Sequence, residues 1–126
     1  MKYELNRSDN TEIVTHNLER YEKDVIIHLH DVLKQRGLTI SDLHRMTGIR
    51  IASLSELANA RKYSVNIIHL VLIMQALRIT DVTELFEVRF SAETKAEWAE
   101  EMAHYVSGLT KQQEDEVNDN LQRMNK

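Results

Sequence analysis

The sequence predicts an all-α protein, and the residues that break helices support most of that prediction. The 126 residues contain no proline and only three glycines, at positions 37, 48 and 108. Each glycine marks a break, so the long stretches between them are free to be helical. Apolar residues make up 42% of the chain, which is enough to build a core. We therefore expect one small helical domain with helical extensions.

The composition excludes several other classes of protein. The chain has no cysteine, so it has no disulfide or thiolate chemistry, and we expect a reducing, cytoplasmic location. No run of about 18 apolar residues is present, so no membrane span is expected. The N-terminus, MKYELNRSDN, lacks the apolar core of a signal peptide.

Charge is unevenly distributed along the chain. The formal net charge is −4, and it is −2 over residues 1–24, +1 over residues 25–88 and −3 over residues 89–126. The total charge argues weakly against general nucleic-acid binding. The middle segment alone is not acidic, and a local patch can bind DNA while its flanks repel it.

The first helical stretch is expected to begin at Asp9 or Asn10 and to end before Gly37. Its apolar residues follow a heptad-like seam, made of Val14, Leu18, Tyr21, Val25, His28 and Val32. Three interpretations stay open: one amphipathic helix of a monomer, two helices broken near Lys23–Asp24, or a dimerising arm. In the last case Val14, Leu18 and Tyr21 would lie at the subunit interface.

The central stretch, residues 38–62, is expected to form a helix, a tight turn and a second helix. Thr39 is the expected N-cap of the first helix, and Gly48 suits a sharp reversal because it has no Cβ. We expect the apolar residues of both helices to hold them against a third; these are Leu43, Ile49, Leu54 and Leu57.

Two further helices are expected before residue 90. Ser64 is the expected N-cap of a helix that is apolar almost all round, so we expect this helix to be the most buried. Thr80 is expected to cap a short helix over residues 81–88, with Leu85 and Phe86 facing inward.

The C-terminal segment is expected to form two amphipathic helices. Ser91 caps the first, over residues 92–107, and Gly108 breaks it. Thr110 and Gln113 have the capping-box spacing that opens the second. The apolar stripes are narrow and the opposite faces acidic, so the stripes pack on the domain itself or, as we prefer, on a second subunit. The candidate interface residues here are Trp98, Met102, Tyr105 and Leu121.

These segments together resemble the Cro/repressor-type (Xre-like) helix-turn-helix family over about half of the chain, from Val25 to Val88. The residues that carry the resemblance are Leu43, Thr47, Gly48, Ile49, Ser53, Leu54, Leu57, Asn59, Ile73, Ala76, Leu77, Ile79 and Thr80. The resemblance implies a five-helix lambda-repressor-like domain at residues 25–90. An N-terminal arm and helical extension (1–24) and a C-terminal dimerisation or interaction segment (91–126) would flank it.

The family's function implies a dimeric transcriptional repressor that reads a palindromic operator in double-stranded DNA with the helix at residues 50–58. On that mapping the base-reading candidates are Arg50, Ile51, Ala52, Ser55 and Glu56. The phosphate-contacting candidates are Arg45, Asn59, Arg61 and Lys62. Such proteins are common in phages and mobile elements. An antirepressor, a toxin or another protein is a further candidate partner.

Several positions depart from the family pattern. Ile40, Met46, Ile51 and Ala52 replace polar residues on the face expected to meet DNA, and an apolar exposed surface more often contacts protein. The alternative hypothesis is therefore a repurposed helix-turn-helix that binds another protein, such as a phage inhibitor of the anti-CRISPR type or an antitoxin. His44 stands where Ala is usual, and we expect it to lie against Leu54 or to turn outward.

No other chemistry is indicated. His28 and His30 point to different sides of a helix, and no histidine has a partner at metal-ligand spacing. No glycine-rich phosphate loop or nucleophile motif is recognisable. We expect no cofactor, no metal and no catalytic residue, and hence no enzyme.

Overall fold

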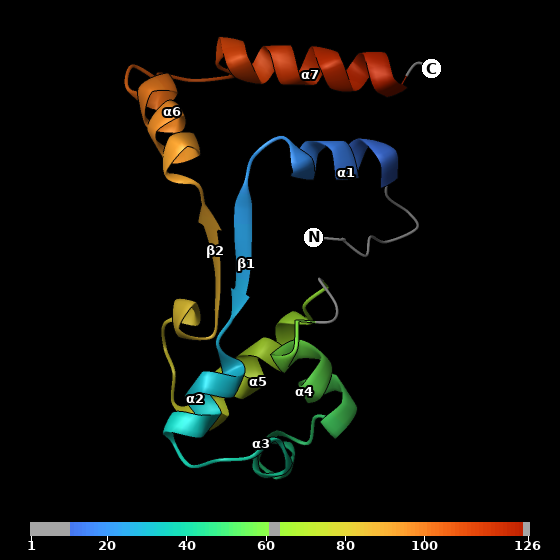
Figure 1. Cartoon of the computed structure of the whole chain (residues 1–126), viewed down its shortest axis with the longest axis vertical. Coiled ribbons are helices and arrows are strands. Elements are labelled where there is room, and N and C mark those ends of the chain that lie inside the picture. The colour runs from blue at the N-terminus through green and yellow to red at the C-terminus, as the bar shows by residue number, and fades with distance from the viewer. Residues whose placement is uncertain (1–10, 61–63, 125–126) are drawn as a thin grey trace. The chain divides into compact units, whose positions relative to one another are not determined.

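The computed structural model describes residues 11–60 and 64–124, and the chain divides into two compact units. The helix-turn-helix unit comprises the described residues of 24–89, and the terminal unit comprises those of 11–23 and 90–124. Across the described residues there are seven α-helices and a two-stranded sheet, so the prediction of a mostly helical protein is confirmed (Figure 1).

The helix-turn-helix unit contains four helices: α2 (Leu29–Gln35), α3 (Ile40–Thr47), α4 (Ile51–Ala58) and α5 (Ile67–Leu77). Helix α3 packs against both α4 and α5, and α2 packs against α4. All four helices contribute to one apolar core, whose buried members are Leu29, Leu33, Leu43, Ile49, Leu54, Ala58, Ile73, Leu77, Ile79 and Leu85. The expectation that Leu43, Ile49 and Leu54 hold the helices together is confirmed, and half-buried Leu57 packs against the same core.

A small sheet replaces part of the expected first helix. Strand β1 (Lys23–Ile27) pairs with β2 (Phe86–Phe90), and the arrows in Figure 1 run in opposite directions. Hydrogen bonds continue the pairing at both ends, from the His28 amide to the Leu85 carbonyl (2.8 Å) and from the Ser91 amide to the Glu22 carbonyl (3.1 Å). The interpretation of this stretch, up to Arg36, as a single helix is therefore wrong. The part of the heptad-like seam after Tyr21, at Val25, His28 and Val32, is wrong for the same reason. Three β-branched residues in a row, at 25–27, favour a strand instead.

Two expectations about α5 are also wrong. Asn66, and not Ser64, caps α5, because its side-chain oxygen accepts bonds from the Ile68 and His69 amides at 2.9 and 3.2 Å. Helix α5 is not the most buried element, since Ile67 and Ile68 are 65% and 67% exposed.

The expected fifth helix is absent. A 3₁₀ turn, η1 (Val82–Glu84), capped by Asp81, leads directly into β2. The alternation of Phe86, Val88 and Phe90 matches a strand period and gives the physical reason.

The terminal unit contains α1 (Thr11–Glu19), α6 (Ala92–Met102) and α7 (Lys111–Met124). Both predicted caps are confirmed. Ser91 Oγ accepts from the Thr94 amide (3.1 Å), and Thr110 and Gln113 form the reciprocal capping box. Helix α6 ends at Met102 and not at residue 107.

Trp98 is the aromatic centre of the terminal unit. Its ring lies 4.8 Å from that of Tyr21 and 4.9 Å from that of Phe90 between centroids. Among the described residues of this unit, Ile13 is the one buried apolar side chain. Aromatic contact therefore supplies much of the packing here.

Candidate nucleic-acid interface

A set of short hydrogen bonds fixes the turn between α3 and α4. Thr39 and Asp42 form a capping box that starts α3. At the other end, Thr47 Oγ1 donates to the Leu43 carbonyl (2.8 Å) and accepts from the Ile49 amide (3.1 Å). Gly48 takes the left-handed conformation (φ +80°) that its position in the turn requires. These bonds set where α4 begins.

His44 is a turn residue that the sequence did not reveal. Its Nδ1 lies 2.6 Å from the Ile49 carbonyl oxygen, across the turn. A neutral ring with the proton on Nδ1 donates to that carbonyl and ties α3 to the start of α4. The half-buried His44 side chain thus does not turn outward, and it stabilises the geometry on which α4 depends.

Helix α4 has one face toward the core and one toward solvent. Leu54 and Ala58 are buried on the inner face. Ile51, Ala52 and Ser55 lie at positions i, i+1 and i+4, which share a face of a helix. The outer face of α4 therefore carries a short strip of apolar and polar side chains, which we name the α4 strip.

The predicted base-reading residues divide by exposure. Arg50 is the N-cap residue of α4 and is exposed, as are Ile51 and Ala52, while Ser55 and Glu56 are half-buried. Arg50 makes no side-chain capping bond, so its guanidinium is available at the first turn of the helix.

Two of the predicted phosphate-contacting residues, Arg45 and Asn59, already have partners in this fold. Arg45 pairs with Asp42 one turn before it, and its side chain is 69% exposed. The Asn59 amide nitrogen donates to the Ser55 carbonyl (2.9 Å), and its oxygen lies 3.0 Å from His30 Nε2. Arg61 and Lys62 lie outside the described residues.

Asp42 keeps a negative charge near Arg45. The Thr39 backbone N–H, followed by its hydroxyl and the nearby Arg45 charge, lowers the pKa of this carboxyl group. Arg45 must therefore be shared between Asp42 and any phosphate that it contacts.

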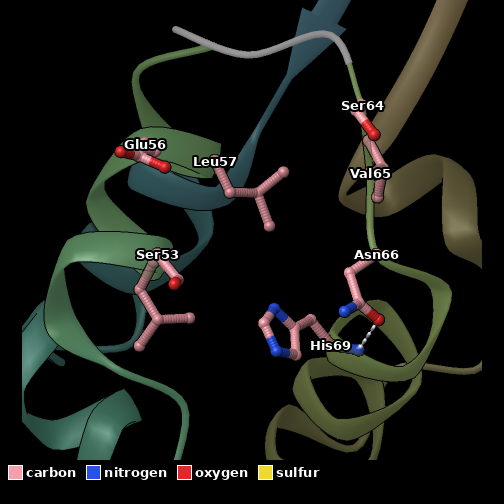
Figure 2. A pocket seen from close by; sticks show the side chains of 8 residues that line it. Ser53, Glu56, Leu57, Ser64, Val65, Asn66 and His69 are labelled. Carbon is pink, nitrogen blue, oxygen red and sulfur yellow. Dashed lines mark hydrogen bonds between the residues drawn. The ribbon is translucent and has the colours of Figure 1, made fainter. Parts of the chain in front are cut away.

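A pocket of about 130 Å³ lies between α4 and the start of α5 (Figure 2). Leu57 from α4 and His69 from α5 point into it, and Ser53, Glu56 and Asn66 help to line it. Asn66 is occupied as the α5 cap. The pocket is large enough to hold several waters between α4 and the start of α5.

The apolar residues that depart from the family pattern on this face differ in how deeply they are buried. Ile40 is half-buried and packs against the core, so the fold itself accounts for it. Met46 and Ile51 are each 46% exposed and have no such explanation. They are exposed apolar side chains of α3 and α4.

The candidate partner-interface residues are split between packed and exposed positions. Val14, Leu18, Tyr21 and Trp98 are half-buried within the terminal unit. Met102, Tyr105 and Leu121 are 41%, 46% and 49% exposed. On α7, Val117 and Met124 flank Leu121 at helical spacing and are also exposed, which gives this helix an uncovered apolar stripe.

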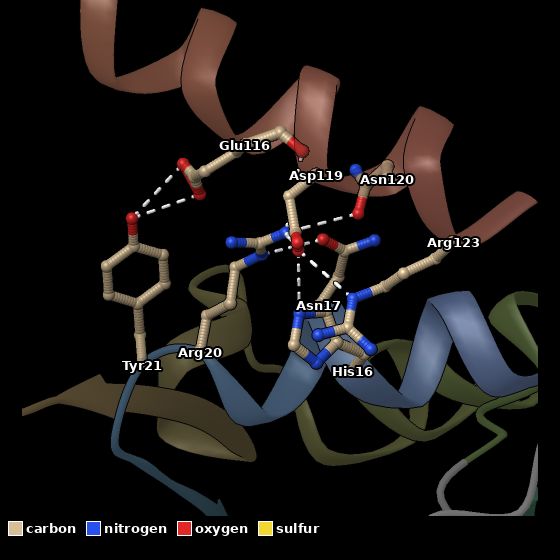
Figure 3. A network of polar contacts seen from close by, with 8 residues as sticks. All are labelled: His16, Asn17, Arg20, Tyr21, Glu116, Asp119, Asn120 and Arg123. Carbon is tan, nitrogen blue, oxygen red and sulfur yellow. Dashed lines mark hydrogen bonds and ion pairs between the residues drawn. The ribbon is translucent and has the colours of Figure 1, made fainter.

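A polar network joins α1 to α7 (Figure 3). Asp119 lies 2.7 Å from Arg20, 2.9 Å from His16 and 3.2 Å from Arg123. Arg20 also reaches the Glu116 carbonyl (3.4 Å) and the Asn120 amide oxygen (3.2 Å). No sequence signal pointed to this network, because its members lie about a hundred residues apart.

The described ranges contain no group of three or more His, Cys, Asp or Glu side chains placed to hold a metal ion. None of the helices in the described ranges has the length and apolar character needed to cross a membrane.

Comparison with known families gives one match. A family model described as the Cro/C1-type HTH DNA-binding domain matches residues 28–91, which is half of the chain. The match contains all of α2 to α5 and β2. No curated protein and no solved structure was found to match the chain.

Proposed function

We propose that this chain, which belongs to the Cro/C1-type helix-turn-helix DNA-binding family, is a dimeric, repressor-like regulator that reads a palindromic operator in the cytoplasm. Helix α4 and its cap, residues 50–58, would enter the major groove of each half-site. The observation that carries this proposal is the exposed N-terminal turn of α4, whose position is fixed by the bonded turn before it.

The chemistry of the α4 strip supports a specific contact pattern. Arg50 can donate two hydrogen bonds to a guanine edge, and Ser55 can donate or accept. Glu56 can accept from a cytosine amino group, whereas Ile51 and Ala52 can contact thymine methyl groups. Specificity would therefore rest on few hydrogen bonds, with DNA shape contributing the remainder.

Phosphate contacts would position this strip without reading sequence. We assign this role to Arg45, Asn59, Arg61 and Lys62. They lie in the one segment of the chain whose formal charge is positive. Because Arg45 and Asn59 have intramolecular partners, binding would exchange those bonds for phosphate contacts.

The dimer proposal is supported by the uncovered stripe on α7. Val117, Leu121 and Met124 recur at i, i+4 and i+7 and are all exposed, which is the pattern of a helix that pairs with another. Two copies joined through the terminal units would each bind one half-site, and the two half-sites would lie about one turn of the DNA helix apart.

In vitro selection from random double-stranded DNA, at stated salt, tests the proposal. We expect enrichment of an inverted repeat. In gel-shift titrations with the selected site, Arg50→Ala should weaken binding by about 1–3 kcal/mol. Arg89→Ala removes the same charge from the same unit at another exposed site and should change binding little. Equal losses in both variants would remove the assigned role of Arg50.

A second candidate function is protein binding by the same face, favoured by the exposure of Met46 and Ile51. Ile51→Asp would then abolish capture of a host or toxin-like partner in a pull-down, while the wild-type protein enriches no DNA sequence. Recovery of a palindrome, together with equal capture by wild type and Ile51→Asp, would reject this candidate.

A further inference from the structure

The terminal unit contains a hollow of about 550 Å³ that the DNA-binding role does not use. We name it the acidic hollow, and it is lined by Tyr21, Glu97, Trp98, Glu100, Glu101 and Gln112. A second hollow of about 380 Å³ shares Tyr21, Trp98 and Glu101 with it and adds Glu116. Both lie within the one compact unit.

Only some of the carboxylates that line the two hollows accept hydrogen bonds from the protein. Glu101 accepts a bond from the Thr110 hydroxyl (2.7 Å), and Glu116 accepts from the Tyr21 hydroxyl (3.0 Å). The side-chain carboxylates of Glu97 and Glu100 have no hydrogen bond or ion pair within residues 11–60 and 64–124. No basic side chain lines either hollow, so their negative potential is not neutralised locally.

The aromatic wall adds a second kind of complementarity. Tyr21 and Trp98 meet edge to face, and both line the hollow while only half-buried. Burial and the neighbouring Glu116 raise the pKa of the Tyr21 hydroxyl, so it stays neutral and keeps its donated bond at physiological pH. Aromatic surface beside carboxylates favours a cation with a flat or weakly hydrated head group.

We propose that the acidic hollow binds an arginine side chain presented by a basic segment of a partner protein. The carboxylates would accept the guanidinium hydrogen bonds and the Trp98 ring would contact its plane. DNA is excluded as an occupant by its phosphate charge. A bare metal ion is disfavoured because no three ligands converge among the described residues. The inference adds a partner-binding site in the terminal unit to the proposed function, and it does not depend on DNA binding.

The chain provides its own reporter, because Trp98 is its single tryptophan. The full-length protein, without DNA, is titrated with an amidated ten-residue peptide of alternating arginine and glycine. The same peptide with neutral citrulline for arginine is the ligand control. We expect a saturable change in Trp98 emission and a calorimetric binding signal with the arginine peptide, and neither with the citrulline peptide.

Matched variants separate the hollow from general charge attraction. Glu97→Gln/Glu100→Gln should weaken binding about tenfold or more. Glu93→Gln/Glu114→Gln removes the same two charges from exposed positions outside the hollow and should weaken it less than threefold. Circular dichroism checks that both variants are folded.

Three results would overturn the proposal: equal losses in the two double variants, no saturation with the arginine peptide, or equal binding of the citrulline peptide. Each leaves the DNA-binding proposal untouched, because its own test uses DNA and Arg50. Conversely, failure of the operator selection would not alter the peptide titration.

Discussion

The two units of the chain are stabilised in different ways. The helix-turn-helix unit buries ten apolar side chains in one cluster. The terminal unit buries Ile13 and Thr94 among its described residues and depends on the Trp98 aromatic contacts and the Asp119 network. Apolar burial is the larger source of stability, and exposed ion pairs contribute little. The helix-turn-helix unit therefore has the larger source of stability, and the terminal unit depends more on a few aromatic and polar contacts.

Leu43→Ala should produce the largest effect, in the helix-turn-helix unit. Leu43 is 0% exposed at the centre of α3, so its truncation should lower the free energy of unfolding by about 3–4 kcal/mol. Met46→Ala is the matched control on the same helix, and because Met46 is 46% exposed, we expect a cost below about 0.5 kcal/mol. Urea unfolding followed by circular dichroism measures both. Similar costs for the two variants would show that α3 is not packed as described.

Trp98→Ala should have a smaller effect, in the terminal unit. It removes ring contacts with Tyr21 and Phe90, and we expect a loss of about 2–3 kcal/mol because the side chain is only half-buried. Trp98→Phe keeps one ring and should lose about half as much. Hydrogen exchange of the α6 and α7 amides measures the change. An unchanged exchange pattern in Trp98→Ala would contradict an aromatic centre.

Local signals in the sequence predicted three helix starts and one turn correctly. Thr39, Ser91 and Thr110 cap helices where expected, and Gly48 turns the chain where expected, because each depends on residues within one turn. The β1–β2 pair was missed because it joins segments about sixty residues apart. The β-branched run at 25–27 was also read as part of a helix, because the apolar residues around it have a heptad-like spacing. Exposure of Ile67 and Ile68 was missed because periodicity alone cannot show which apolar faces find a neighbour.

The candidate site was predictable only in part. The α4 register follows from Leu54 and Ala58 facing the core, and this register places Arg50 and Ile51 outward. The His44 bond to the turn and the His30 bond to Asn59 depend on side-chain geometry that no spacing encodes. These side-chain hydrogen bonds could therefore be identified only from the structure, although the helices that carry them were predicted from the sequence.

Arg78→Gly should stabilise the helix-turn-helix unit by about 0.5–1 kcal/mol. Arg78 ends α5 with φ +59°, a left-handed conformation that costs a residue with a Cβ about 1–2 kcal/mol. Glycine removes that cost. Part of the gain in stability is lost because glycine also raises the conformational entropy of the unfolded chain. Arg78→Ala keeps the strained conformation and should not stabilise. Thermal unfolding of the three proteins measures the order, and a glycine variant no more stable than the alanine variant would contradict it.

Acid should weaken the Asp119 network, the smallest effect that we predict. Hydrogen bonds from Arg123, His16 and Arg20 lower the pKa of Asp119 below its ordinary value of 3.8. Because the folded pKa lies below the unfolded one, the stabilisation is complete well above pH 3.8 and is lost as pH falls through the lower, folded value.

The emission of Trp98, which lies in the same unit, should therefore change in acid in the wild-type protein. In Asp119→Asn this acid dependence should become smaller, because the network no longer contains the Asp119 carboxylate. Glu114→Gln removes a carboxylate of α7 outside the network and should keep the wild-type curve. An unchanged acid curve in Asp119→Asn would mean that the carboxylate does not hold α1 against α7. The packing of the terminal unit would then rest on its aromatic contacts alone.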